Sequence, residues 1–253
     1  MKPVIRVTQL ESFRRFICGE YDFITEQSVI ENITQEFTGN EYTRIGSAFH
    51  KVVELGSIQD VERIGLATRV EAGERSFTYY NKPKTEPTPQ GWRIGIGDDT
   101  AVLDDEQVET AERYAREYPA AIHEVRTYKE YDDVVVTGCA DIINGLEIRD
   151  IKTKYSTIND ADYINSAQWR FYMELFECQY FAFDLFAFDG YKLETHGDDV
   201  RGLPLNPIHP SINCVWYNKL QEDNKLLLKE FLQWIKCRNL EKYLQNEKLN
   251  GIF

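Results

Sequence analysis

The sequence lacks any closely spaced pair of cysteines. Its cysteines are five in number, and no two of them form a C-x-x-C pattern. An odd number of scattered thiols argues against a disulfide framework, a zinc site and an iron–sulfur cluster. Reduced, partly buried thiols are expected at all five positions: Cys18, Cys139, Cys178, Cys214 and Cys237.

Long apolar runs are also missing. The opening segment, "MKPVIRVTQLESF", has neither the apolar core of a signal peptide nor the Arg/Ser-rich character of a transit peptide. The most apolar stretch, "YFAFDLFAFDG", is short and is broken by Asp184 and Asp189. A membrane span needs a much longer apolar segment, so we expect no membrane association and a cytoplasmic location.

Positive charge is scarce as well. The chain has 29 Lys and Arg residues against 42 Asp and Glu residues, which gives a formal net charge of -13. This balance argues against a general polyanion binder, because phosphate contacts require a positive surface. It leaves open a nucleic-acid enzyme with a local basic groove, since carboxylates that bind metal ions add to the negative total.

The sequence does contain the material of one large domain. Its 253 residues are 42% hydrophobic, which is enough for a real core. We expect a single α/β (α+β) domain over residues 1–253 with a loop insertion at about 69–100, of which 81–91 is rich in Pro, Thr and Lys. Hydrophobic periodicity predicts helices at 8–18, 41–56, 104–118, 160–176 and 219–244, and strands at 123–131, 133–143, 146–153, 178–188 and 212–217.

A predicted hairpin brings charged residues together. Asn-Gly between two apolar runs favours a two-residue turn at Asn144-Gly145. In that register Asp141 faces Ile148, so that Asp141, Asp150 and Lys152 share one face of the sheet. A carboxylate and a lysine two residues apart on a strand are more often a solvated or structural ion pair than a site. The addition of Asp141 raises the alternative of an active site.

Two further pairs stand one helical turn apart. His50 and Glu54 lie in "GSAFHKVVE", and Gln168 and Tyr172 lie in "SAQWRFYMELF". Taken alone, His50 is more often a packed side chain than a metal ligand, and Tyr172 is more often a core residue. Their significance depends on the order of all these segments.

The ordered segments "GSAFHKVVE", "GCAD", "DIKT" and "QWRFY" resemble the RecB-like branch of the PD-(D/E)XK nuclease superfamily. The resemblance spans residues 46–172 and includes phage-type recombination exonucleases and CRISPR-associated nucleases of the branch. It implies a restriction-endonuclease-like core, in which a central mixed β-sheet is flanked by helices. Some members of the branch carry an iron–sulfur cluster, but the C-terminal cysteines here are too dispersed for one.

The resemblance implies a role for each motif residue. His50, Asp141 and Asp150 would be metal ligands, together with the backbone carbonyl of Ile151, and Lys152 would be the catalytic lysine beside Asp141 and Asp150. Carboxylates suit Mg²⁺ or Mn²⁺, and one imidazole favours Mn²⁺ somewhat. Lys152 would position the attacking hydroxide and stabilise the charge that develops on the phosphate.

Gln168 and Tyr172 would border the DNA. The implied function is a metal-dependent deoxyribonuclease, an exonuclease of recombination, repair or phage DNA metabolism. Two alternatives stay open: a structure-specific endonuclease, and a catalytically silent DNA-binding or scaffold subunit. DNA is the expected partner, and the resemblance is compatible with a homo-oligomer, a single-strand-annealing protein or a separate helicase, since the chain has no helicase motif of its own.

Overall fold

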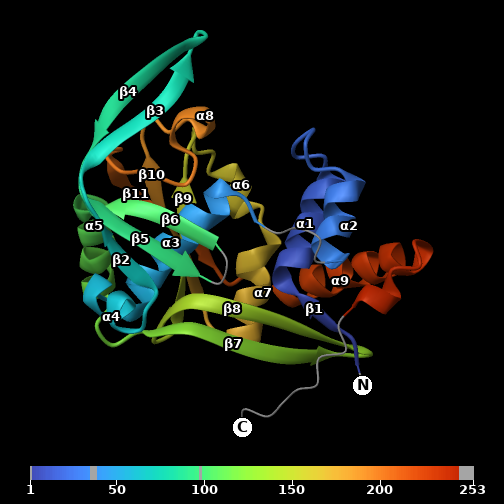
Figure 1. Cartoon of the computed structure of the whole chain (residues 1–253). Helices are drawn as coiled ribbons and strands as arrows, with labels where there is room; N and C mark the ends of the chain where they lie inside the picture. Colours follow the sequence, from blue (N-terminus) through green and yellow to red (C-terminus); the bar gives the residue numbers. More distant parts are fainter. Residues whose placement is uncertain (1, 35–38, 97–98, 245–253) are drawn as a thin grey trace.

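A central mixed sheet forms the middle layer of the protein (Figure 1). The computed structural model describes residues 2–34, 39–96 and 99–244. The sheet order is β1-β8-β9-β10-β11, and β7 also pairs with β8. The β1–β8 and β9–β10 pairs are parallel and the others are antiparallel. The bounds are β1 Val4–Arg6, β7 Ile122–Tyr131, β8 Val134–Asn144, β9 Glu147–Lys154, β10 Tyr180–Phe188 and β11 Leu205–Val215.

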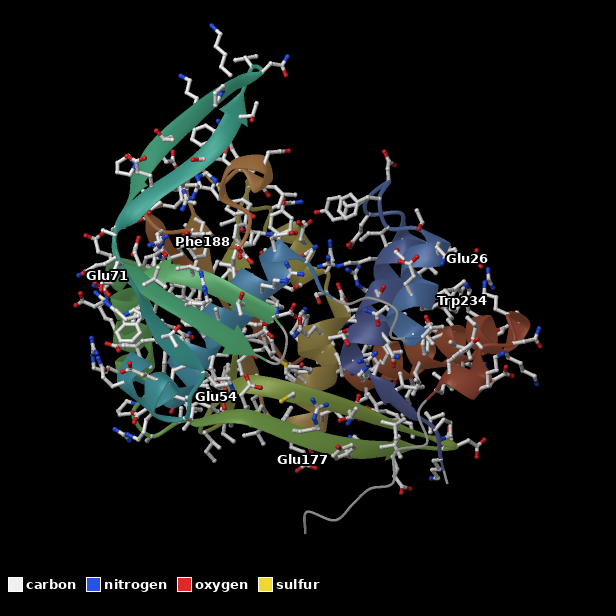
Figure 2. The ribbon with its side chains drawn as sticks, in the orientation of Figure 1. Glu26, Glu54, Glu71, Glu177, Phe188 and Trp234 are labelled. Atoms are coloured by element: carbon white, nitrogen blue, oxygen red, sulfur yellow. The ribbon has the colours of Figure 1, made fainter. Side chains whose placement is uncertain are left out.

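Helices cover both faces of this sheet, which confirms the expected fold class. Because side chains alternate along a strand, Ile148 faces one core and Ile151 faces the other. Trp234 belongs to the first core and Phe188 to the second (Figure 2). The first core contains residues of α1 Val7–Cys18, α2 Glu26–Thr34, α6 Ala161–Ile164, α7 Ala167–Phe176 and α9 Leu220–Cys237.

The second core lies under a smaller sheet. Its helices are α3 Glu41–Leu55, α4 Ile58–Arg63 and α5 Asp105–Glu117. The three-stranded sheet beside them consists of β2 Ala67–Val70, β5 Gly91–Ile96 and β6 Asp99–Asp104. The predicted helices at 41–56 and 104–118 are confirmed as α3 and α5 to within one residue at each end. None of the helices in the described ranges has the length and apolarity that crossing a membrane requires.

The prediction that residues 81–91 belong to a loop is wrong. Lys82–Thr88 forms strand β4, which pairs with β3 Gly73–Tyr79 in a separate hairpin. Tyr80 and Asn81 both have positive φ, as a two-residue type I′ turn requires. Pro83 and Pro87 suggest a loop, but an edge strand tolerates proline wherever no ladder hydrogen bond is needed. Residues 97–98 of the expected insertion lie outside the described residues.

The predicted turn of the β8–β9 hairpin is displaced by one residue. Asn144 pairs with Glu147, so the two central turn residues are Gly145 and Leu146. Gly145 has a φ of 64° at the first central position, where a type II′ turn places glycine. Ile148 therefore faces Ile143 and not Asp141. The error shifts the register by two residues, so each side chain keeps its predicted face.

The long helix predicted at 160–176 is interrupted. Ser166 separates α6 from α7, and its hydroxyl accepts a hydrogen bond from the backbone N–H of Gln168. This is the capping role for which serine is preferred at a helix start. The predicted C-terminal helix likewise ends at Cys237 and is followed by a short 3₁₀ turn at Glu241–Tyr243. A further short helix, α8, spans Leu193–His196.

Candidate metal centre and cleft

Helix α3 presents His50 to the sheet. Gly46 lies one turn before His50, and a β-carbon at Gly46 would stand only 3.0 Å from the Thr153 hydroxyl oxygen. A larger residue would therefore crowd the Thr153 side chain, whereas glycine lets α3 lie close to β9. Because the two elements approach closely here, the His50 ring reaches the backbone of β9, where its Nε2 atom lies 3.0 Å from the carbonyl oxygen of Ile151.

Strands β8 and β9 separate beside the same residue, Ile151. The last paired residues are Ile142 and Arg149. Just beyond them, Asp141 Oδ2 accepts a 2.8 Å hydrogen bond from the Ile151 N–H. The carboxylate thus satisfies a donor that a neighbouring strand would otherwise satisfy. Asp141 is held between the two strands by this bond.

The orientation of the His50 ring directs its Nδ1 atom toward Asp141. A carbonyl oxygen can only accept, so the Nε2 atom carries the proton that it donates to Ile151. In the neutral ring Nδ1 then presents a lone pair, 3.7 Å from Asp141 Oδ2. Two electron-pair donors that face each other at this distance are stabilised by a cation between them.

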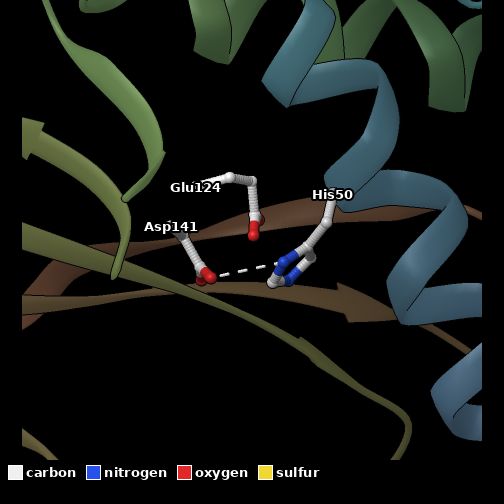
Figure 3. Close-up of side chains that lie close together, drawn as sticks. All are labelled: His50, Glu124 and Asp141. Carbon is white, nitrogen blue, oxygen red and sulfur yellow. Dashed lines mark ion pairs between the residues drawn. The ribbon is translucent and has the colours of Figure 1, made fainter. Parts of the chain in front are cut away.

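Glu124 forms a cluster with His50 and Asp141, although no sequence motif pointed to it. The ligand atoms of His50, Glu124 and Asp141 all lie within 4.8 Å of one another (Figure 3). Glu124 lies opposite Asp141 in the β7–β8 hairpin, at a point where the regular pairing is interrupted. Its φ is 52°, an unfavourable value for a residue with a side chain. A count back from the Asp132-Asp133 turn would have placed it there.

Asp150, Lys152 and Gln168 form a second cluster, beside the first. Asp150 is only 2% exposed. Its Oδ1 atom accepts a 2.7 Å hydrogen bond from the Gln168 amide, and its Oδ2 atom forms an ion pair with Lys152. The Lys152 ammonium is the partner that the described residues give to Oδ2. The predicted pair of Asp150 and Lys152 is therefore an ion pair in the structure.

The charges of the two clusters influence one another. Burial raises the pKa of Asp150 to about 6, against the opposing effect of the Lys152 ammonium. Burial also raises the pKa of Glu124, and the nearby Asp141 carboxylate adds to the shift. For Lys152, burial lowers the pKa but Asp150 and Asp141 outweigh it, so its pKa is raised. Three acids thus converge beside one ammonium, an arrangement that a divalent cation would neutralise.

A cleft of about 570 Å³ opens onto this region. Helix α3, strand β9 and Glu124 form its walls. Because Lys152 lies on the cleft wall, its ammonium can reach a molecule bound there. The cleft is lined by Tyr42, Thr43, Gly46, Ser47, His50, Lys51, Glu54, Glu124, Ile151, Lys152, Thr153 and Tyr155.

Tyr172 takes another position from the one expected of a substrate-binding residue. It is 4% exposed, and its hydroxyl donates a 2.8 Å hydrogen bond to the carbonyl oxygen of Cys139. The ring packs in the first core and does not line the cleft. Tyr172 therefore supports β8 from behind, two residues before Asp141. Gln168, one turn earlier, reaches Asp150 and not the cleft.

Known proteins offer only a weak likeness. No model of a protein family matches the sequence, and no curated protein matches it. Among solved structures, a candidate exonuclease from Eubacterium rectale is 13% identical, with a TM-score of 0.48 over 99% of this chain and 91% of that one. A phage-related exonuclease from Haemophilus somnus 129PT is also 13% identical, with a TM-score of 0.42 over 94% of this chain and 97% of that one. Both structures are similar in fold only.

Proposed function

We propose that this chain is a metal-dependent deoxyribonuclease, an exonuclease of the RecB-like branch of the PD-(D/E)XK superfamily. One observation carries the proposal: the backbone of Ile151 joins two clusters of motif residues. Its N–H donates to Asp141 and its carbonyl accepts from His50, while its chain neighbours are Asp150 and Lys152. Three of the ordered motifs thus meet at Ile151 beside the cleft, and Gln168 of the fourth motif donates to Asp150.

The residues at this point fit a divalent cation. Asp150 Oδ2 is buried with only the Lys152 ammonium as partner among the described residues, and Asp141 Oδ2 faces the Nδ1 lone pair of His50. Oxygen donors with one imidazole suit Mg²⁺ or Mn²⁺. His50, Asp141, Asp150 and Glu124 would hold the ion. A bound cation would make a water molecule more acidic and neutralise charge on the phosphate.

The resemblance implies that the Ile151 carbonyl is a metal ligand. In this proposal the carbonyl instead orients a metal ligand. Histidine ligands usually donate their second ring N–H to a carbonyl or carboxylate, which fixes the ring orientation. The bond from His50 Nε2 to Ile151 matches this pattern. The carbonyl would therefore orient His50, and Nδ1 would be the ligand atom.

Lys152 and Gln168 would act on either side of Asp150. The raised pKa of Lys152 keeps its amine protonated, and its side chain is 36% exposed on the cleft side. An ammonium there can stabilise negative charge on a phosphate oxygen in the transition state. Gln168 would hold Asp150 in position by donating to Oδ1.

The deciding experiment uses linear DNA labelled at its 5′ or 3′ end, in single-stranded and duplex form. The purified chain is incubated with each substrate in Mg²⁺, in Mn²⁺ and in excess chelator. We expect shortening of the labelled strand with either metal and none with chelator. Intact DNA in every metal-containing reaction would overturn the proposal, and DNA binding without cleavage would favour the silent subunit.

A further inference from the structure

The β3–β4 hairpin, residues 73–88, extends away from the body of the protein above α8 (Figure 1). It is a separate two-stranded sheet, and most of its residues outside the base are exposed. A two-stranded hairpin is marginally stable alone and contributes little to a core. The contacts at its base therefore decide how the hairpin is held.

Arg75 fixes the base of the hairpin. Its side chain is 8% exposed and forms ion pairs with Glu86 across the hairpin, at 2.6 Å, and with Asp199, at 3.2 Å. The same guanidinium donates to the carbonyl oxygens of Asp199 and Arg201, at 2.7 and 3.0 Å. Bonds to both a side chain and the backbone of the body hold the hairpin in one direction.

The outer half of the hairpin differs in charge from the rest of the chain. Between residues 76 and 85 it has two lysines and no acidic residue, whereas the whole chain has a net charge of -13. Lys82 and Lys84 are exposed, and Tyr80 at the turn is 82% exposed. Phe77 is paired across the strands with Lys84. A basic, aromatic tip suits a polyanion with planar rings.

Packed aromatic rings link the base of the hairpin to a residue of the cleft. Arg75 and Phe77 are two residues apart, so they share the face that contacts the segment after α8. Beside this face, the His196 ring stacks on the Tyr191 ring, with 5.5 Å between the ring centroids. The Tyr191 and Tyr155 rings are also in contact, with 4.8 Å between their centroids, and Tyr155 lines the cleft. Aromatic rings therefore connect the cleft to the hairpin base.

We propose that the β3–β4 hairpin is an arm that binds the single-stranded part of a DNA substrate as it leaves the cleft. This inference rests on the proposed nuclease function and adds a substrate class to it. Lysines contact the phosphates, and the exposed ring of Tyr80 stacks on a base. Only an unpaired base offers its face for stacking, so the tip favours single-stranded over duplex DNA.

The test compares three full-length variants with the wild type. Lys82→Glu/Lys84→Glu reverses the charge of the arm, and Tyr80→Ala removes the exposed ring. Lys225→Glu/Lys229→Glu makes the same charge change on exposed positions of α9, which lies at the other end of the molecule (Figure 1). Anisotropy of labelled oligothymidine and of a duplex of equal length is measured in chelator over a range of salt.

We expect the double lysine variant of the arm to bind oligothymidine about tenfold or more weakly at about 0.1 M salt, with a salt slope reduced by about 1.4. Tyr80→Ala should cost at least about fivefold. The α9 variant should match the wild type. If the arm variants bound oligothymidine as tightly as the α9 variant, the proposed role of the arm in DNA binding would be overturned. If the arm variants lost as much affinity for the duplex as for oligothymidine, the preference for single strands would be overturned.

A separate readout distinguishes this inference from the proposed function. A chromogenic thymidine phosphodiester contains a single nucleotide, so it offers no strand for the arm to bind. Arm variants should hydrolyse it at the wild-type rate with Mn²⁺, which shows that the metal site is intact. No hydrolysis by the wild type would instead contradict the nuclease, whatever the binding measurements give.

Discussion

His50 Nε2 lies 3.0 Å from the carbonyl oxygen of Ile151, and Asp141 Oδ2 lies 2.8 Å from the N–H of the same residue. The backbone N–H and C=O of one residue of β9 therefore orient an acid from β8 and a histidine from α3. Both contacts are made by protein atoms alone, so the protein itself fixes the positions of the two side chains. Preorganised ligands lose less entropy on binding, which favours affinity.

The orientation of His50 leads to a test of its ligand atom. The side-chain amide of asparagine can occupy the place of Nδ1, and that of glutamine the place of Nε2. Because Nδ1 faces Asp141, we expect His50→Asn to retain more Mn²⁺ affinity than His50→Gln, which should lose about 10- to 100-fold. Titration calorimetry measures both.

The control for this pair is His209→Asn, at an exposed position of β11 outside the cleft. It should bind Mn²⁺ as the wild type does. If His50→Gln kept full affinity and His50→Asn lost it, Nε2 would be the ligand atom. The bond to Ile151 would then have to break when the metal binds.

Glu124 offers a second test, because its backbone is strained. A φ of 52° costs a residue with a β-carbon about 1 kcal/mol or more, and glycine avoids this cost. We expect Glu124→Gly to keep or raise the melting temperature of the metal-free protein while it weakens Mn²⁺ binding about tenfold or more. Thermal unfolding with and without Mn²⁺ gives both quantities.

Glu130→Gln serves as the comparison, since Glu130 lies on the same strand and its side chain is 71% exposed. It should change neither the melting temperature nor the metal effect. Unchanged Mn²⁺ binding in Glu124→Gly would remove Glu124 from the metal site. The strain at this position would then have no functional explanation.

Part of the geometry of the candidate site was predictable because it depends on local rules. The parity of side chains along β9 puts Asp150 and Lys152 on one face, whatever the register of the hairpin. Helical spacing puts Gln168 on the turn before Tyr172, although its contact with Asp150 was not predicted. These rules hold within one element, and the elements themselves are strongly periodic.

Other features required tertiary knowledge. The sequence does not reveal that the pairing of β8 with β9 stops at Ile142 and Arg149. The hydrogen bond from the Ile151 N–H to Asp141 could therefore not be predicted. The environment of Tyr172 depends on how α7 packs behind β8. Glu124 was missed for a different reason, because the turn at Asp132-Asp133 has no glycine and gives a weaker hairpin signal than Asn-Gly.

The raised pKa of Asp150 predicts that metal binding at the proposed site depends on pH. Its pKa is raised by burial to about 6, so below that pH a proton competes with the cation for the carboxylate. We expect the apparent Mn²⁺ affinity to fall about tenfold for each pH unit below about 6. The increase in melting temperature on addition of Mn²⁺, followed from pH 5 to pH 8, measures this effect.

In the metal-free protein, Asp150 should make the folding stability fall as the pH rises, which is opposite to the trend in Mn²⁺ affinity. A raised pKa means that the folded state prefers the neutral acid, so this stabilisation is present at low pH and is lost as the pH rises through about 6. Asp150→Asn cannot ionise and should flatten that part of the stability profile. An identical profile in the variant would show that Asp150 titrates normally.

Lys152 gives the most direct test of the chemistry. If its ammonium stabilises the transition state, Lys152→Ala should reduce the single-turnover rate at saturating DNA about 10²- to 10³-fold, with little change in DNA affinity. Lys154→Ala is the matched control, because Lys154 is two residues further along the same face of β9 but lies over the Tyr163 ring, outside the cleft lining. It should keep its rate within a few-fold. A wild-type rate in Lys152→Ala would end the assignment of Lys152, since a charge that contributes only to folding would lower the melting temperature and leave the chemical step unchanged.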